Sequence, residues 1–415
     1  MYQSNYPGGG NLMTVWLIVL KSLRQHALST VITAFSVALA GGLLMSVWSI
    51  QEQSEAAFTG VNAGFDAVLG ARGSKLQLVL NAIFNLEASP GNLAWSDFLD
   101  IQNNPDVELA VPIAVGDNYR GYRIVGTTLD LFEKTEYAPG KKFTLQPGGN
   151  WFDPARREAV VGDFVARNMN LKVGDTFHPF HGLIFDEKNQ HSETYVVMGV
   201  LKPSNTPADR VIWIPLEGIQ KMSGHDPALA TEVSAVLVKL KAGSPLAGFQ
   251  MDLMYNRQGN RLTFAWPIAA IMAELFDKIG WFNRVLALVS YLVAIVAAAS
   301  ILAGIYNSMN ERRREIAILR TLGARRSTIF VCILLEAASI STLGMLAGFA
   351  IYGIIFTVVA GIIRAQTGVV LDPLKFNPVM LWAPAVLIAL GAFAGIIPAV
   401  KAYRTDIASN LTPHS

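Results

Sequence analysis

The sequence has little cysteine and little charge. Cys332 is the single cysteine among 415 residues, which excludes an intramolecular disulfide, so any large domain must be stable through its own hydrophobic core. Only 15% of the residues are charged and 52% are hydrophobic, whereas about 25% are charged in an average soluble domain. This composition excludes an ordinary soluble protein and indicates a membrane protein with a substantial soluble part.

The sequence also lacks the motifs of common catalytic sites. A phosphate-binding loop needs the pattern G-x-x-x-x-G-K-[ST], because its backbone amides hold phosphate and its hydroxyl holds Mg²⁺. The glycine- and lysine-containing stretches 70–75 and 140–142 fail this pattern and are expected to form turns. There is no H-E-x-x-H motif, and no Ser/His/Asp arrangement can be assigned from chain order. We therefore expect a chain that is not an enzyme and binds no cofactor of its own.

Four apolar stretches are long enough to cross a membrane, since about 20 mainly apolar residues span a hydrocarbon core of ~30 Å. They are residues 28–50, 281–309, 328–363 and 378–401. The first begins too far inside the chain, and runs too long before an A-x-A-like cleavage site, to be a removable signal peptide, so it is expected to be a retained anchor. The third contains Gly344, Gly348 and Gly353, and the first is also rich in small residues. These faces are expected to pack closely against neighbouring helices.

Basic residues in the short connecting segments predict the orientation, because positively charged loops stay in the cytoplasm. Lys21 and Arg24 precede the first apolar stretch, six arginines lie within 310–327, and Lys401 and Arg404 lie at the end of the fourth. Residues 1–27, 310–327 and 402–415 are therefore expected to be cytosolic, together with both termini. The loop 364–377 and the large region 51–280 are expected outside. Within the first segment, the apolar run NLMTVWLIVLKSLR predicts an interfacial helix. The alternative is that it extends the first transmembrane helix.

The region 51–280 has short β-rich runs separated by turn residues, with helical patches between them. Strands are expected at 107–115, 122–126, 158–162, 194–201, 210–215 and 232–240. Helices are expected at 75–85, 95–102, 163–170 and 244–256. This mixture predicts an α+β domain. The loop-rich stretch 128–157 marks a candidate boundary between two lobes.

Histidines offer the best candidate for a chemical site outside the membrane. His178, His181 and His191 are close in the sequence and have acidic residues nearby, so they could supply ligands for zinc or another transition metal. The alternative is that they form turns and hydrogen bonds in a loop, and no firm metal site is assigned. His225 and Asp226 stand apart in the sequence and are expected to belong to a turn.

An amphipathic run follows the first apolar stretch closely. Its apolar residues fall at helix spacing: Leu76, Val79, Leu80, Ile83 and Phe84. They are expected either to pack against the domain or membrane, or to form a surface near the outer leaflet. Such a surface could receive an amphiphilic substrate or a periplasmic partner.

Two stretches resemble a known family. The membrane domain of FtsX and MacB permeases resembles the stretch EIAILRTLGARRSTIFVCILLEAASISTLGMLAGFAIYG, which has an LRTLGA turn, a glutamate and a glycine-spaced helix. The periplasmic domain of MacB-type proteins resembles REAVVGDFVARNMNLKVGDTF and the later TYVVMGVL. The resemblance covers nearly the whole chain. It implies a polytopic α-helical membrane protein of the type VII ABC transporter superfamily, with four transmembrane helices, a MacB-like periplasmic core domain and LolC/LolE-like topology.

The resemblance also implies partners and a mechanism. Such a permease dimerises in the bacterial inner membrane, with itself or a paralogue, and binds two copies of a cytosolic ATPase that hold ATP and Mg²⁺. It conveys their closure to the external domains, which is called mechanotransmission, to export or extract a lipid, lipoprotein, peptide or haem-like compound. A periplasmic adaptor or substrate-binding protein and membrane lipids are compatible partners, whereas nucleic acid is not expected. The alternatives are an FtsX-like regulator that activates a periplasmic enzyme, and a metal-binding membrane scaffold.

The segment 310–327 is the expected ATPase-docking helix. It carries an apolar stripe beside a charged side that includes six arginines, a pattern that suits a groove on a partner protein. The alternative is that the arginines only set the orientation and contact phospholipid. The match to the family favours docking. The residues assigned to ATPase coupling are Glu315, Ile316, Leu319, Arg320, Leu322, Gly323 and Ala324.

Glu336 is the second candidate for coupling. It lies ten residues after Arg326, which is about 15 Å along a helix and therefore near the inner edge of the hydrocarbon. A carboxylate within the membrane indicates a function. The family has a glutamate at the matching position, which implies a structural or coupling role. A proton relay is the alternative, but the neighbouring spans offer no second ionisable group.

Overall fold

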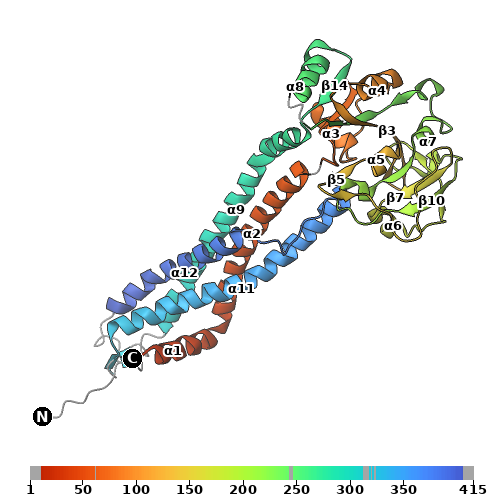
Figure 1. Ribbon diagram of the computed structural model, residues 1–415. Coiled ribbons are helices and arrows are strands. Elements are labelled where there is room, and N and C mark those ends of the chain that lie inside the picture. Colours follow the sequence, from red (N-terminus) through yellow and green to blue (C-terminus); the bar gives the residue numbers. More distant parts are fainter. Residues whose placement is uncertain are drawn as a thin grey trace. The chain divides into compact units, whose positions relative to one another are not determined.

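The computed structural model describes residues 11–60, 62–242, 246–311, 317–318, 320–321 and 324–404 (Figure 1). They form two compact units. The helical unit comprises Met1–Glu52, Gly280–Ala360 and Asp372–Ser415. The α/β unit comprises Gln53–Ile279 and Gly361–Leu371.

Long helices make up the helical unit. They are α1 (Asn11–Gln25), α2 (Ala27–Gly60), α9 (Ile268–Glu311), α11 (Arg326–Thr367) and α12 (Val379–Arg404). The last four are long and apolar enough to cross a membrane, which confirms the four expected spans. The chain turns at His26, so α1 is a helix separate from α2 and does not simply extend it (Figure 1). Its interfacial position stays a prediction.

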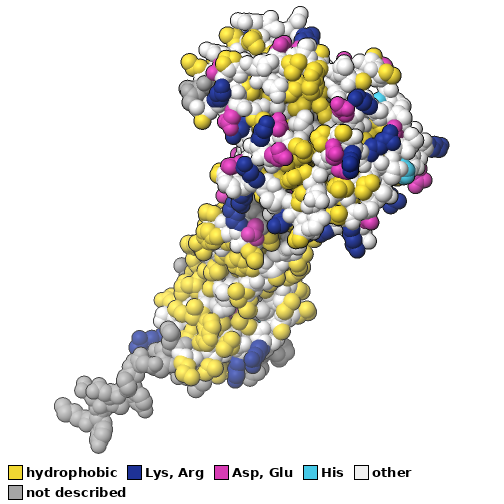
Figure 2. Space-filling view, turned by 45° about the vertical axis from the view of Figure 1, so that its right-hand side comes forward, with side chains coloured by type: hydrophobic (Ala, Val, Ile, Leu, Met, Phe, Trp, Pro, Cys, Tyr) yellow, Lys and Arg dark blue, Asp and Glu magenta, His cyan; other side chains and the backbone are white. Residues whose placement is uncertain are grey.

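The surface of the helical unit is apolar. Hydrophobic side chains cover the face of these helices that Figure 2 displays. Large ones are exposed on every spanning helix, for example Ile32 on α2, Ile295 on α9, Leu346 on α11 and Phe393 on α12. An apolar surface this extensive does not suit water and is the surface expected against lipid.

Glycines let α11 approach α2 closely. A Cβ atom at Gly344 would lie 2.6 Å from Cβ of Val37, and one at Gly348 would lie 3.3 Å from the carbonyl oxygen of Ala38. At Gly353 a Cβ atom would have no described atom within 4 Å. The close packing predicted from the sequence is therefore present at the first two glycines and not at the third within this chain.

We expect Gly344→Val to destabilise the helical unit, because the added side chain must push α2 and α11 apart. Overpacking of this kind costs about 1–3 kcal/mol. The matched control is Gly353→Val, which makes the same change in the same helix where there is open space. Thermal unfolding of the purified chain in detergent, followed by circular dichroism, should show a lower midpoint for the first variant only. Equal midpoints for the two variants would contradict close packing of α2 and α11.

The α/β unit is built on one ten-stranded sheet, in the order β14-β1-β13-β3-β4-β11-β7-β10-β8 with β9 paired to β3. The strands are β1 (Ala67–Ala71), β3 (Val107–Tyr119), β4 (Tyr122–Thr127), β7 (Glu158–Val161), β8 (Thr176–Phe177), β9 (Phe180–His181), β10 (Tyr195–Val200), β11 (Ile212–Pro215), β13 (Ala235–Leu240) and β14 (Leu262–Ala265). Two small sheets pair β2 (Leu93–Ala94) with β12 (Glu232–Val233), and β5 (Glu136–Ala138) with β6 (Lys141–Lys142).

Short helices cover both faces of this sheet. They are α3 (Lys75–Ala82), α4 (Trp95–Gln102), α5 (Asp130–Glu133), α6 (Asp163–Met169), α7 (Leu216–Gln220) and α8 (Ala247–Asp252), with the helical turns η1 (Glu187–Asn189), η2 (Pro207–Arg210), η3 (Pro227–Leu229) and η4 (Leu253–Gln258). Successive strand residues enter opposite cores: Ala67 and Leu69 of β1 lie in one, Val68 in the other. Helices α4, α6 and α7 pack on the first core and α3 and α5 on the second. The predicted α+β domain is confirmed.

The predicted division into two lobes near 128–157 is wrong. Strand β4, which precedes this stretch, pairs in parallel with β11, which follows it, from Ile124 opposite Ile212 to Thr127 opposite Pro215. The loop-rich stretch therefore connects strands of one continuous sheet, because hydrogen-bonded neighbours in a sheet can be far apart in the sequence.

The amphipathic run at α3 does not form an exposed apolar surface. Val79, Ile83 and Phe84 are at most 4% exposed and lie in the second core. Leu76 and Leu80 are partly buried against that core. The periodicity was a correct sign of a helix, but its apolar side faces the sheet. Of the two alternatives for these five residues, packing against the domain is confirmed, and the surface for a substrate or partner is corrected.

Candidate functional site

Most of the predicted coupling residues lie outside the described part of the chain. They are Glu315, Ile316, Leu319, Leu322 and Gly323. Among their described neighbours, Ala317 is 3% exposed and Ile318 is 43% exposed, so successive side chains face different surroundings. Arg320 is half-buried in a short helical piece. Ala324, the last of the predicted set, lines a pocket at the start of α11.

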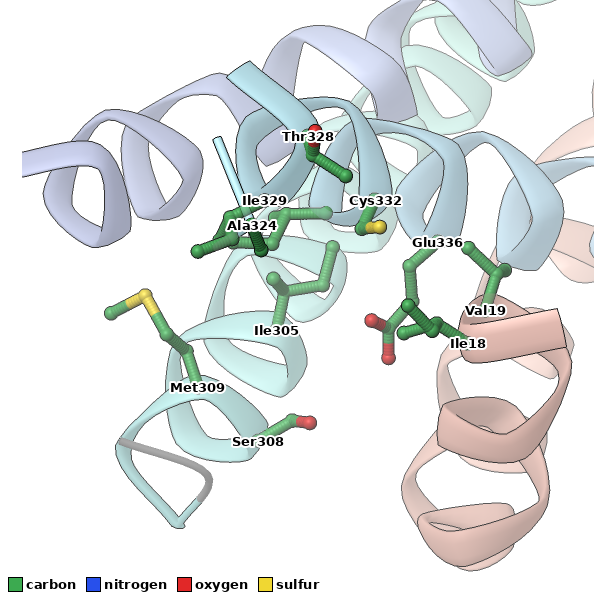
Figure 3. Close-up of a pocket in the computed structure, with 11 residues that line it drawn as sticks. Ile18, Val19, Ile305, Ser308, Met309, Ala324, Thr328, Ile329, Cys332 and Glu336 are labelled. Atoms are coloured by element: carbon green, nitrogen blue, oxygen red, sulfur yellow. The ribbon is translucent and has the colours of Figure 1, made fainter. Parts of the chain in front are cut away.

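This pocket lies between α1, the end of α9 and the start of α11, and it has a volume of about 60 Å³ (Figure 3). Its wall is largely apolar. The lining includes Ile18, Val19, Ile305, Met309, Ile329 and Ile333. Helix α1 therefore meets the two helix ends that flank the predicted cytosolic segment, although it is far from them in the sequence.

Glu336 is the charged residue of this pocket. Its side chain is 8% exposed, and Figure 3 shows the carboxylate turned toward α1 and the end of α9. The hydroxyl of Ser22 on α1 donates a hydrogen bond to its Oε1 atom. A buried carboxylate is costly without such donors, so this contact holds α1 to α11. The arrangement fits a structural or coupling role.

We expect Ser22→Ala to loosen the attachment of α1, because it removes a donor to a buried carboxylate. A hydrogen bond of this kind contributes about 0.5–2 kcal/mol within a membrane protein. Ser36→Ala is the control, since the hydroxyl of Ser36 only donates to Ile32 of its own helix, at 3.1 Å. Limited proteolysis after α1, together with thermal unfolding in detergent, should separate the two variants. If Ser22→Ala behaves like Ser36→Ala, the contact with Glu336 does not hold α1.

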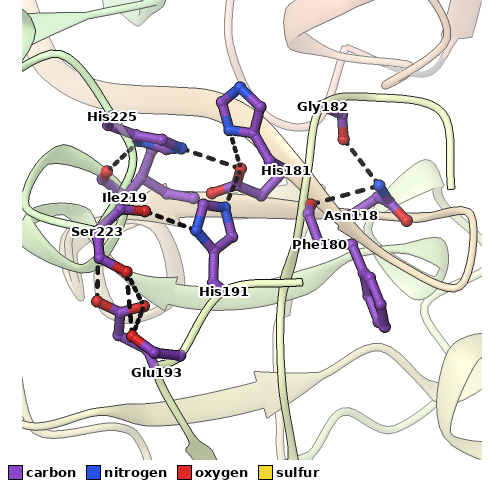
Figure 4. A network of polar contacts seen from close by, with 11 residues as sticks. Asn118, Phe180, His181, Gly182, His191, Glu193, Ile219, Ser223 and His225 are labelled. Carbon is purple, nitrogen blue, oxygen red and sulfur yellow. Dashed lines mark hydrogen bonds and ion pairs between the residues drawn. The ribbon is translucent and has the colours of Figure 1, made fainter. Parts of the chain in front are cut away.

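A second polar cluster lies in the α/β unit. Asp117 is on β3, His181 ends β9, His191 follows η1 and His225 follows α7. The Oδ1 atom of Asp117 is 3.1 Å from Nε2 of His191, 3.1 Å from Nε2 of His225 and 3.5 Å from Nδ1 of His181. Figure 4 shows the three imidazole rings converging from different segments. These residues form what we call the histidine cluster.

The carboxylate governs the electrostatics of the histidine cluster. Burial alone would raise the pKa of Asp117, but hydrogen bonds with His191 and His225 outweigh it and lower the pKa. The same hydrogen bonds raise the pKa of His191 and the pKa of His225, against the opposing effect of burial. Asp117 is therefore an ionised carboxylate in the interior of the domain, and it requires positive charge nearby.

A further carboxylate holds the loop behind the cluster. Glu193 accepts hydrogen bonds from the backbone N–H of Ser223 at 2.9 Å and from its hydroxyl at 2.7 Å. Burial would raise the pKa of Glu193, but these hydrogen bonds lower it. The carbonyl oxygen of Ser223 in turn lies 2.7 Å from Nδ1 of His191. The loop thus fixes the orientation of that ring (Figure 4).

The structure brings together two of the three histidines named from the sequence. His181 and His191 join the cluster, whereas His178 instead places its Nδ1 atom 3.0 Å from the carbonyl oxygen of Glu193. His225 is not an isolated turn residue, because it contacts Asp117 from 108 positions away. Sequence reasoning missed Asp117. The available signal was a charged residue inside a long apolar strand.

Family models match most of the chain. Residues 26–253 match the model of the MacB-like periplasmic core domain. Residues 287–407 match the model of the FtsX-like permease C-terminal domain. The two matches cover the expected soluble and membrane parts in the expected order.

Curated relatives show the same relationship at low identity. A macrolide export ATP-binding/permease protein MacB from Brucella melitensis is 24% identical over 93% of this chain and 58% of that protein. The probable syringafactin export ATP-binding/permease protein SyfD from Pseudomonas syringae is 25% identical over 62% of this chain and 40% of that protein. The uncharacterized ABC transporter permease YvrN from Bacillus subtilis is 30% identical over 57% of this chain and 59% of that protein. The chain spans about half the length of these relatives.

Proposed function

Because the chain belongs to the family of ABC transporter permeases with a MacB-like periplasmic core domain and an FtsX-like C-terminal domain, we propose that it couples an ATPase to its external domain. It is a membrane protein with an extracytoplasmic domain. The observation that carries the proposal is the insertion of the α/β unit between the first and second of four membrane-length helices. Helices α2 and α9 run without interruption from one unit into the other, so they would carry motion from the membrane helices to the α/β unit.

The partner that supplies the energy is a separate cytosolic ATPase, present in two copies, which binds ATP and Mg²⁺. The chain itself has no phosphate-binding loop and acts as a non-catalytic subunit. A second permease copy or a paralogue completes a dimer in the bacterial inner membrane. Both termini and the segment 310–327 face the cytosol in this proposal, supported by the basic residues next to the membrane-length helices, which are Lys21, Arg24, the six arginines of 310–327, Lys401 and Arg404.

The pocket of Glu336 supports a coupling path inside the membrane. Helices α9 and α11 flank the segment 310–327, and both line the same pocket as α1. A push on the docking helix would therefore reach three helices at once. Glu336 would transmit it through its hydrogen bond with Ser22, because a packed and hydrogen-bonded contact moves as a unit.

The proposed class of substrate is based on the names of similar proteins. Two of them are named for export of macrolides and of syringafactin. We propose an amphiphilic substrate such as a lipid, lipoprotein, peptide or haem-like compound, exported or extracted by mechanotransmission from the external side. An FtsX-like regulator that activates a periplasmic enzyme is the alternative outcome of the test below.

We expect Glu315→Ala, Arg320→Ala and Gly323→Val to uncouple the ATPase. Each change removes a contact or reshapes the helix at the docking surface, and loss of a central contact weakens binding by about 2 kcal/mol, or roughly 30-fold. The control is Arg325→Lys, which keeps the positive charge that sets the orientation. ATPase co-purification and substrate-stimulated ATP hydrolysis are measured in proteoliposomes with the cognate ATPase.

Unchanged ATPase binding and activity in all three variants would show that the segment is not a docking site. Release of amphiphilic cargo that depends on ATP supports transport. ATP-dependent activation of a periplasmic enzyme without cargo release supports the regulator instead.

A further inference from the structure

We propose that the α/β unit binds one Zn²⁺ ion through Asp117, His181, His191 and His225. The coordinating atoms would be a carboxylate oxygen of Asp117, Nδ1 of His181, Nε2 of His191 and Nε2 of His225. This proposal is independent of the proposed coupling to an ATPase, since it concerns only residues of the α/β unit.

The spacing of the donor atoms suits a tetrahedral ion. All four lie within 4.8 Å of one another. Ligands at about 2.0–2.1 Å from a tetrahedral zinc ion are about 3.4 Å apart. The separations of 3.1 to 3.5 Å between Asp117 and the three rings are close to this value. Small rotations of the side chains would complete the geometry.

The orientation of two rings supports ligation more strongly than their proximity. Nδ1 of His191 faces the carbonyl oxygen of Ser223 at 2.7 Å, and Nδ1 of His225 faces that of Ile219 at 2.8 Å. A carbonyl oxygen only accepts, so both Nδ1 atoms carry the hydrogen and donate it. This leaves Nε2 of each ring as the atom that faces Asp117, at 3.1 Å in both cases. A cation between these atoms and the carboxylate would be coordinated by both sides, and metal-bound histidines usually have such a second hydrogen bond.

The carboxylate of Asp117 also has an oxygen atom that could bind an ion. Asp117 is fully buried, and its Oδ2 atom has no hydrogen-bond partner among the described residues. The rings of the three histidines have centroids only 5.0 to 5.5 Å apart, so a single ion beside the carboxylate would be within reach of all three.

The donor types favour zinc over the hard cations. Imidazole nitrogens suit zinc and other transition metals, whereas calcium and magnesium prefer sites made of oxygen atoms. Three nitrogens and one oxygen therefore select against Ca²⁺ and Mg²⁺. Four protein ligands also close the coordination shell, so the site is not built to activate a water molecule.

The ion has a route to the site. His181 and His225 line an open hollow of about 350 Å³, together with Gly116 and Ser234. The side chain of His181 is 54% exposed, while those of His191 and His225 are 5% and 16% exposed. His181 is thus the ligand at the entrance and the others form the inner part. A site with one accessible ligand can exchange its ion with the medium, unlike a fully buried structural site.

Isothermal titration of the full chain tests the proposal. The purified protein in detergent is stripped with a chelator, transferred to metal-free buffer and titrated with ZnCl₂. We expect binding of one Zn²⁺ per chain and no binding of Ca²⁺ or Mg²⁺. Substitution of Co²⁺ for Zn²⁺ should give the visible absorption of a tetrahedral complex, which reports the ligand geometry directly.

Variants identify the ligands. His181→Ala changes a half-exposed residue and should keep the fold, yet it should weaken zinc binding by at least about 100-fold, because changes even outside the ligand shell cost 10–100-fold. Asp117→Asn and His191→Ala should do the same. The matched control is His178→Ala, which lies in the same loop but outside the cluster and should bind zinc as the wild type does.

Circular dichroism of the metal-free variants shows whether each variant folds. If the variants of the buried ligands fail to fold, His181→Ala still tests the proposal, because its side chain is half-exposed. The proposal is overturned if the wild type binds no zinc, or if His181→Ala binds it as tightly as His178→Ala. Octahedral Co²⁺ spectra would also overturn the four-ligand assignment.

Discussion

Inside a bilayer every backbone N–H and C=O group must find a partner within the protein, and this requirement governs the helical unit. Only helices satisfy it for single segments, so the apolar parts of the chain are helical throughout α2, α9, α11 and α12. Lipid gives these helices no hydrophobic reason to associate, and close packing must hold them together. Gly344 and Gly348 meet this need by bringing α11 against Val37 and Ala38 of α2.

In the α/β unit the hydrophobic effect is the main constraint instead, and helices bury the sheet on both faces. Alternate residues of β1 and β13 enter two different cores, so most charged groups are excluded from the interior. Asp117 on β3 is a fully buried exception. A strand that admits one buried carboxylate must surround it with donors or a cation, and three segments converge to provide them.

Local patterns in the sequence were sufficient for the long helices and for the longer strands. Helix α4 has the predicted bounds of 95–102, and β3, β4, β7, β10, β11 and β13 fall close to the expected runs, because period and turn residues are local properties. Strands β1, β8, β9 and β14 of the same sheet were not predicted. Which other element covers each face of a helix or strand depends on residues that are distant in the sequence. Amphipathic spacing identified α3 but not the sheet that buries Val79, and chain order kept His225 apart from Asp117, 108 positions away. The family match named the coupling segment without placing Glu315, which lies outside the described residues.

Two buried carboxylates have different partners, and the roles proposed for them differ accordingly. Glu336 accepts a hydrogen bond from a serine hydroxyl within an apolar wall, and this combination fixes the position of a helix while offering few ligands to an ion. Asp117 faces three imidazoles, two of which are oriented by backbone carbonyls, beside a hollow open to solvent. The first arrangement suits transmission of force, since it links helices. The second suits exchange of a ligand, since its donors are preorganised and one of them is accessible. The two proposed roles, coupling and ion binding, thus concern separate units of one chain.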